Sequence, residues 1–154
     1  MMKQIFRALG ATLLVAGIGL ALAGPASAGV SAAEQRKVAM KALGGHMKAI
    51  GAVAKGKAAF SAAIPVHAQA INEMAQYMGL LFPAGSGGSE TRAKPEIWSD
   101  GPGFAAKLEA FAGATPALVA AAKTGNAGAI GAALSKVGKN CGGCHKPFRV
   151  PKKK

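Results

Sequence analysis

Both cysteines of this chain stand in one pentapeptide, Cys141-Gly142-Gly143-Cys144-His145. Two thiols three residues apart, followed at once by a histidine, form the attachment signature of a c-type haem. Each thiol can add to one vinyl group of the haem, and the next imidazole can bind the iron. Because neither cysteine is then free, the chain has to fold with a haem fixed to this segment. No other feature of the sequence constrains the fold as strongly.

Other uses of a Cys-x-x-Cys pair fit the sequence less well. A structural zinc needs four ligands, and the chain has only His46 and His67 outside the motif to add to it. A thioredoxin-like redox pair needs a βαβ context, and no strand pattern alternates with a helix pattern here. A disulfide across so short a loop would stabilise little. We therefore predict one haem c, attached through Cys141 and Cys144.

The N-terminus has the pattern of an export signal. Lys3 and Arg7 precede an apolar stretch over residues 8–23, and Ala26-Ser27-Ala28 is a small-residue cleavage pattern. The apolar stretch is too short and too rich in glycine to favour a membrane span. Covalent haem attachment takes place outside the bacterial cytoplasm, which agrees with export. We predict a signal peptide over residues 1–28, cleaved after Ala28, and a periplasmic protein.

The remaining residues, 29–154, have the length of a single domain, for which we predict no membrane span. The chain carries a net formal charge of +13, and only Lys3 and Arg7 of that excess belong to the predicted signal. A basic surface favours acidic protein partners and speeds encounter with them. Nucleic acid is the other usual partner of such a surface. Export and the absence of a nucleic-acid motif argue against it, so we predict acidic redox proteins as partners.

Apolar residues recur with helical spacing in four segments of the domain. Ser31 and Glu34 form a capping box where the first segment begins, and Thr124-Gly125-Asn126 separates the last two. The stripes are Arg36, Met40, Leu43, Met47, Ile50 and Ala54; His67, Ile71, Met74, Met78 and Leu81; Phe104, Leu108, Phe111, Thr115 and Leu118; and Ile130, Leu134, Val137, Cys141, Cys144 and Phe148. Four amphipathic helices predict an all-α fold, an antiparallel four-helix bundle with the covalently bound haem inside it.

The link from Phe82 to Gly103 is longer than most connections and is rich in glycine and proline. Long links of this kind are often functional. We expect this one to line the edge of the haem.

Three stretches together resemble the class II c-type cytochromes, and most closely cytochrome c′. They are Arg36-x-x-x-Met40 with Lys41, the run TRAKPEIWSD over residues 91–100, and Cys141-x-x-Cys144-His145-x-x-Phe148-Arg149. The resemblance covers essentially the whole predicted domain. It implies a one-electron haem carrier rather than an enzyme, and it allows a homodimer formed through the first two helices.

The resemblance also implies roles for residues of the last helix. Cys141 and Cys144 would form the thioether bonds, His145 would be the proximal iron ligand, and Arg149 would lie beside it. The sequence departs from a simple helix at this point, because Pro147 removes one backbone hydrogen bond and its ring clashes with the preceding turn. We expect the helix to kink or stop near Lys146.

Residues near the propionate edge of the haem are implied in the same way. Arg36 matches a family arginine close to the propionates, and Lys37 and Glu90 occupy positions that can touch the same edge. Trp98 is expected to be a packing residue rather than an electron conduit.

Met40 matches the position on the distal face of the iron. In cytochrome c′ members an apolar side chain there typically leaves the iron five-coordinate, and such an open iron should bind small diatomics such as nitric oxide and carbon monoxide. A related low-spin branch uses a methionine there as the sixth ligand. The run over residues 94–100 and Phe148-Arg149 are typical of the high-spin members. We expect an open sixth site that binds these gases, with stable His145 and Met40 ligation as the alternative. His46 and His67 are less favoured alternative ligands, and no distal His and Arg pair is available for peroxide cleavage.

Overall fold

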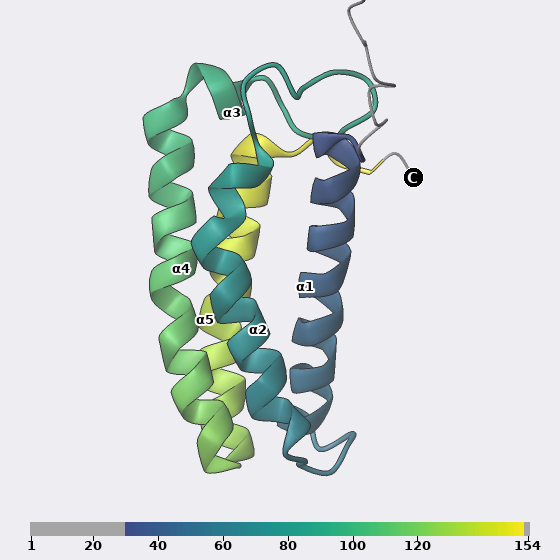
Figure 1. Ribbon diagram of the computed structural model, residues 1–154. Helices are drawn as coiled ribbons and strands as arrows, with labels where there is room; N and C mark the ends of the chain where they lie inside the picture. Colours follow the sequence, from purple (N-terminus) through teal and green to yellow (C-terminus); the bar gives the residue numbers. More distant parts are fainter. Residues whose placement is uncertain (1–29, 153–154) are drawn as a thin grey trace, which may run out of the picture.

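The structure is a computed structural model that describes residues 30–152; the predicted signal peptide and its cleavage site lie outside the described residues. The helices are α1 (Ala32–Ala54), α2 (Ala63–Tyr77), the 3₁₀-helix η1 (Met78–Leu81), the single turn α3 (Glu96–Ser99), α4 (Gly101–Thr124) and α5 (Ala127–Phe148). Figure 1 shows the four long helices side by side and antiparallel. The predicted all-α four-helix bundle is therefore confirmed. Within residues 30–152 no strand forms.

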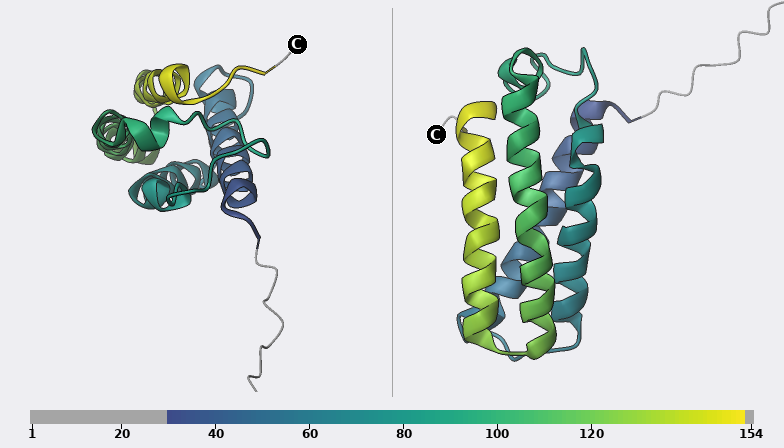
Figure 2. Two further views of the ribbon diagram at one scale, coloured as in Figure 1. Left: turned by 90° about the horizontal axis from the view of Figure 1, so that it is seen from above. Right: turned by 90° about the vertical axis from the view of Figure 1, so that its left-hand side faces the viewer.

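Each long helix packs against two others, in the cyclic order α1, α2, α4, α5. The end-on view in Figure 2 shows this arrangement around a common centre. The link between α2 and α4 crosses one end of the bundle, beside the last turns of α5 and the first turns of α1 (Figure 1). The segment with the cysteine pair therefore lies at the same end as the long glycine- and proline-rich link.

Capping side chains mark the first residues of α1 and α5. Ser31 Oγ accepts a hydrogen bond from the Glu34 amide (3.2 Å), and Asn126 Oδ1 accepts one from the Ala129 amide (2.9 Å). These two bonds satisfy amides that have no partner within the helix. Gly125 ends α4 with a φ of 68°, a left-handed conformation that suits glycine. Both helix starts agree with the sequence pattern.

The half of the bundle away from the cysteine pair has a closed core. We call this part of the bundle the closed half. Its largest fully buried side chains come from all four long helices: Ile50, Ile71, Leu118, Ile130, Val137 and Thr115. The hydroxyl of Thr115 lies 2.7 Å from Asn72 Oδ1 and 2.8 Å from the carbonyl oxygen of Ala112. The one polar side chain among these residues therefore has hydrogen-bond partners, as buried polar groups require.

The last helix continues further than expected. α5 passes through Lys146 and Pro147 and ends at Phe148, two residues beyond the expected position. A proline in the final turn removes only one backbone hydrogen bond, and the next amide, that of Arg149, still donates to the carbonyl oxygen of His145 (3.1 Å). The turn that carries His145 is thus helical to its end.

Candidate functional site

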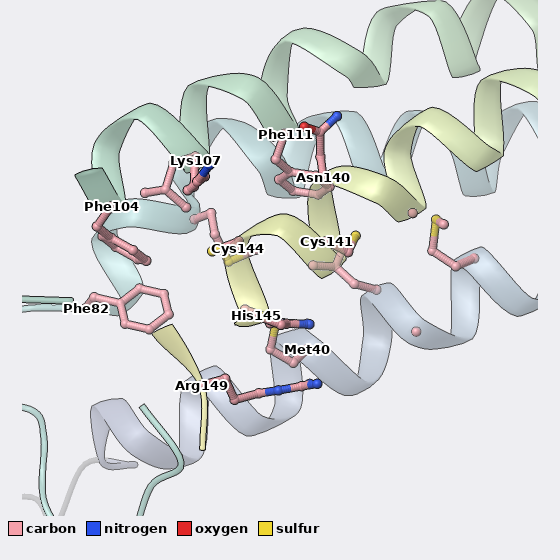
Figure 3. Close-up of a pocket in the computed structure, with 16 residues that line it drawn as sticks. Met40, Phe82, Phe104, Lys107, Phe111, Asn140, Cys141, Cys144, His145 and Arg149 are labelled. Atoms are coloured by element: carbon pink, nitrogen blue, oxygen red, sulfur yellow. The ribbon is translucent and has the colours of Figure 1, made fainter. Parts of the chain in front are cut away.

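Two adjoining cavities lie beside the cysteine pair at one end of the bundle. We call this part of the bundle the open half. The first cavity has a volume of about 350 Å³ and the second about 630 Å³. Both are lined by Met40 from α1, Phe82 from the link, Phe104 from α4, and Cys144, His145 and Arg149 from the end of α5. Figure 3 shows these side chains around the first cavity. The shared lining shows that the two cavities adjoin and that together they form the space beside His145.

All the site residues expected from the sequence border this space. Cys141 lines the first cavity, and Arg36, Lys37 and Glu90 line the second. The link contributes Ser89, Thr91, Arg92 and Ala93 to the lining of the second cavity.

The two thiols are positioned by successive turns of α5 and face the first cavity. Neither is in a disulfide. Burial raises the pKa of both thiols, and for Cys144 the neighbouring Cys141 raises it further, while Lys107 and Arg149 act in the opposite direction. Two partly buried thiols on one cavity wall match the geometry that double attachment of a haem requires.

His145 lies one residue after the second thiol and lines both cavities. Burial lowers the pKa of its imidazole, and the positive charges of Arg149 and Arg92 lower it further. The neutral imidazole is the form that binds a metal ion. The surroundings of His145 therefore favour the state that an iron ligand needs.

Arg36 is a buried cation at the wall of the second cavity, with 4% of its surface exposed. Its guanidinium donates to the carbonyl oxygen of Leu81 (2.9 Å) and to Ser86 Oγ (2.7 Å), and it lies over the ring of Phe82 (5.1 Å to the centroid). Burial lowers its pKa.

No carboxylate neutralises this cation. Among residues 30–152 the ion pair formed is that of Lys37 with Glu34, and Arg36 Nε is buried without a hydrogen-bond partner. A buried charge with an unused donor is costly unless it meets an anion. A haem has two propionates, so the open space, the paired thiols and this unpaired donor together fit a covalently attached haem.

A short clasp joins the link to the chain segment after α5. The Lys94 amide donates to the carbonyl oxygen of Phe148 (3.0 Å), and the Val150 amide donates to that of Arg92 (2.8 Å). The Arg92 side chain adds a bond from Nε to the carbonyl oxygen of Val150 (2.8 Å). This clasp, residues 92–94 with 148–150, holds Arg149 at the cavity wall.

Aromatic side chains form the floor between the link and the bundle. Phe104 meets Phe82 and Phe148 edge to face, at centroid distances of 4.9 Å and 5.2 Å. Trp98 Nε1 donates to the carbonyl oxygen of Pro83 (3.0 Å), and a Cβ at Gly87 would lie 3.2 Å from its ring. Trp98 thus packs the link against itself and lines neither cavity.

Two histidines that sequence reasoning kept as alternative iron ligands lie elsewhere. His46 and His67 line neither cavity. Their Nδ1 atoms are 2.9 Å apart, in a contact between α1 and α2. Of the three residues that the sequence offered as a sixth iron ligand, Met40 alone lines the cavities.

Sequence reasoning assigned no role to Arg92 or Lys107. Arg92 stood inside the family-like run, which was a usable signal, but its bond to Val150 depends on the path of two distant segments. Lys107 lines the first cavity as an exposed residue of α4, and nothing in the sequence separates it from the other lysines.

One described helix, α4, is long and apolar enough to cross a membrane by length and composition alone. It packs along α2 and α5 and buries Phe104, Phe111 and Leu118. Through these contacts α4 forms one of the four helices of the bundle.

Comparison with known proteins gives a consistent result. Residues 31–149 match the family model described as "Cytochrome C'". A cytochrome c' from Pararhodospirillum photometricum is 40% identical over 117 residues, which cover 75% of this chain and 94% of the relative.

Solved structures agree with the family match. The crystal structure of cytochrome c' from Rubrivivax gelatinosus has a TM-score of 0.71 at 36% identity, covering 77% of this chain and 94% of that one. A ferrous variant of cytochrome c prime from Alcaligenes xylosoxidans with bound nitric oxide has a TM-score of 0.71 at 31% identity, covering 79% and 94%.

Proposed function

Because the chain belongs to the cytochrome c′ family, whose members carry covalently attached haem c, we propose that it binds nitric oxide and carbon monoxide and exchanges single electrons with partner proteins in the periplasm. Cys141 and Cys144 hold the haem, and His145 is the proximal ligand of its iron. The haem supplies the redox chemistry and the gas-binding iron. The residues of the chain set which ligands reach it.

The wall of the first cavity formed by α1 carries this proposal. It consists of Met40, Leu43, Gly44 and Met47, and a Cβ built at Gly44 meets nothing within 4 Å. The glycine leaves space one turn after Met40. An apolar wall with spare room admits small uncharged molecules and disfavours charged or large ones. The nitric oxide complex of the related Alcaligenes xylosoxidans protein supports the same function here.

An optical spectrum of the reduced protein, recorded with and without carbon monoxide, tests gas binding. We expect a high-spin spectrum that changes when the gas is added. A sharp low-spin α-band that the gas leaves unaltered would exclude the gas-binding half of the proposal.

Stable ligation by Met40 is the second candidate, a low-spin carrier dedicated to electron transfer. The observation that favours it is the position of the Met40 thioether, which lines both cavities together with His145. Thioether ligation would raise the reduction potential, so Met40→Ala should lower it and convert the iron to high spin. Met47→Ala is the matched control, because Met47 lines the first cavity only. An unchanged Met40→Ala spectrum would exclude this candidate.

Charge around the second cavity supports acidic partners. Its lining includes Lys37, Lys41, Arg92, Arg149 and Lys152, with Glu90 as the acidic member. A patch of one sign steers an oppositely charged partner and weakens with salt. Electron exchange with an acidic protein should therefore slow as ionic strength rises. A rate independent of salt would contradict this part of the proposal.

The remaining proposals concern location, assembly and the absence of turnover. Mass spectrometry of the exported protein should find a mature chain that begins at Gly29.

The described cavity linings contain His145 but no second histidine, so steady peroxide turnover by the intact haem protein would contradict a non-enzymatic role.

A homodimer through the first two helices is supported by apolar side chains exposed on them. Val38 on α1 and Val66 and Tyr77 on α2 are 59%, 65% and 42% exposed, and Leu80 on η1 is 80% exposed. Burial of such residues favours association. Sedimentation of the haem-loaded protein should give the mass of a dimer, and Val66→Lys should shift it toward a monomer.

A further inference from the structure

We propose that His46 and His67 form a copper(II)-binding site outside the two cavities, between α1 and α2. The two residues are separated by 21 positions in the sequence, and the packing of α1 on α2 brings their Nδ1 atoms to 2.9 Å. Both side chains are partly exposed. A metal ion can therefore reach the pair from solvent without entering the bundle.

The distance between the two nitrogens favours one coordination geometry of the metal. Imidazole nitrogens bind metals such as zinc at about 2.0–2.1 Å. Two nitrogens 2.9 Å apart that both hold such a bond subtend an angle of about 90° at the metal. The rings are tilted by 48° with centroids 5.1 Å apart, so they do not stack face to face. Neighbouring ligands at a right angle are typical of tetragonal sites, which copper(II) and nickel(II) prefer to the tetrahedral geometry of zinc.

The donor atoms point to the same metal. Calcium and magnesium take oxygen ligands, whereas imidazole suits copper, nickel and zinc, and copper(II) binds most tightly of these. In the absence of metal one ring donates a hydrogen bond from its Nδ1–H to the Nδ1 of the other. Binding needs both Nδ1 lone pairs, so that proton moves to Nε2 of its own ring and each imidazole stays neutral. A pair of neutral ligands adds no charge of its own to a strongly basic protein.

The coordination sphere is incomplete in the described part of the chain. No group of three or more His, Cys, Asp or Glu residues that could hold a metal occurs among residues 30–152. The two imidazoles therefore occupy two neighbouring positions, and water fills the others. His46 lies six residues after Met40, which is about 9 Å along the axis of α1. A copper ion there would lie outside both cavities and would not compete for His145.

Copper(II) titration of the haem-loaded protein, followed by calorimetry and electron paramagnetic resonance, tests the site. The haem-loaded form is used because its cysteines and His145 are engaged. We expect one tight equivalent with a tetragonal copper spectrum and coupling to two nitrogens. His46→Ala should weaken binding by roughly 100-fold, since the second imidazole otherwise binds intramolecularly. Gln69→Ala, which changes an exposed neighbour of His67 on α2, should bind as tightly as the unaltered protein.

The same variants can also contradict the proposal. Equal copper affinity in His46→Ala and the unaltered protein, or coupling to a single nitrogen in the latter, would overturn it. Far-UV circular dichroism verifies that each variant keeps its helices. If His46→Ala loses helicity, His67→Phe decides alone, because it keeps an aromatic ring at the helix contact and removes the ligand. Unchanged affinity in His67→Phe would then reduce the pair to a hydrogen bond between two histidines.

Discussion

The same four helices build two unlike halves. In the closed half, Ile50, Leu118 and Ile130 are completely buried. In the open half, Met40 and His145 are partly exposed around cavities, and Arg36 is buried without an anion. The closed half thus satisfies its own apolar and polar groups, and the open half is completed by the haem. The difference indicates that folding can rely on one half while function occupies the other.

Removal of both thiols should give the largest effect, and only in the open half. In a Cys141→Ala, Cys144→Ala double variant we expect no haem to remain with the chain after extraction with acidified solvent, because both thioether bonds are absent. Far-UV circular dichroism should still show helices, since the closed half does not depend on the thiols. Loss of all helical signal would contradict the division into two halves.

A matched pair of leucines on α4 compares the halves directly. In haem-free protein, Leu118→Ala should lower the free energy of unfolding by about 2–5 kcal/mol, because it leaves a void in a packed core. Leu108 already lines the first cavity, so Leu108→Ala should cost clearly less. Urea denaturation followed by circular dichroism measures both. Equal losses would show that the open half is as well packed as the closed half.

Arg36→Met should have a larger effect on stability with the haem than without it. Without haem the change removes a buried charge but also its bonds to Leu81 and Ser86, so unfolding should shift by less than about 1 kcal/mol. With haem we expect the free energy of unfolding to fall by about 1.5–3 kcal/mol. This is the contribution of a hydrogen bond to a charged group, here between Arg36 and a propionate. Chemical denaturation of both forms measures the difference. Lys37→Met, at the exposed neighbour, is the control and should change neither form appreciably.

Loss of the clasp should be smaller still. Arg92→Ala removes the side-chain bonds to the Val150 carbonyl and should cost about 1 kcal/mol. Hydrogen exchange at the Val150 and Lys94 amides should speed up, while exchange in the closed half stays as it was. Lys94→Ala is the control, because Lys94 joins the clasp through its backbone. Unchanged exchange in Arg92→Ala would show that the backbone bonds suffice.

The pH dependence of the haem-free protein should give the smallest effect. The folded chain lowers the pKa of His145 below its ordinary 6.5. The unfolded chain therefore takes up a proton first as the pH falls, and stability present above pH 6.5 is lost as the pH approaches the lowered value. Arg149→Ala should reduce this loss, because one of the charges that lower the pKa is gone. Urea midpoints measured across this pH range test the effect, and a loss on raising the pH would contradict its sign.

Much of the fold could be predicted because its signals are local. The buried positions Leu43, Ile50, Ile71 and Val137 follow from spacings of three and four residues, and the starts at Ser31 and Asn126 follow from capping chemistry. The end of α5 was harder to place. A proline interrupts a helix interior but costs little in a last turn, and only the structure shows that Pro147 is in the last turn.

The sequence by itself determined where the haem attaches, because two thiols and an imidazole within five consecutive residues need no long-range folding to be neighbours. It also determined that Arg36 and Met40 share a helix face. Only the tertiary structure decided that Arg36 lacks an anion, that Arg92 holds Val150, and that His46 meets His67. Each of these depends on how helices rotate against one another and on the path of a long link. Helical spacing specifies which residues share a face, but it does not specify what that face meets.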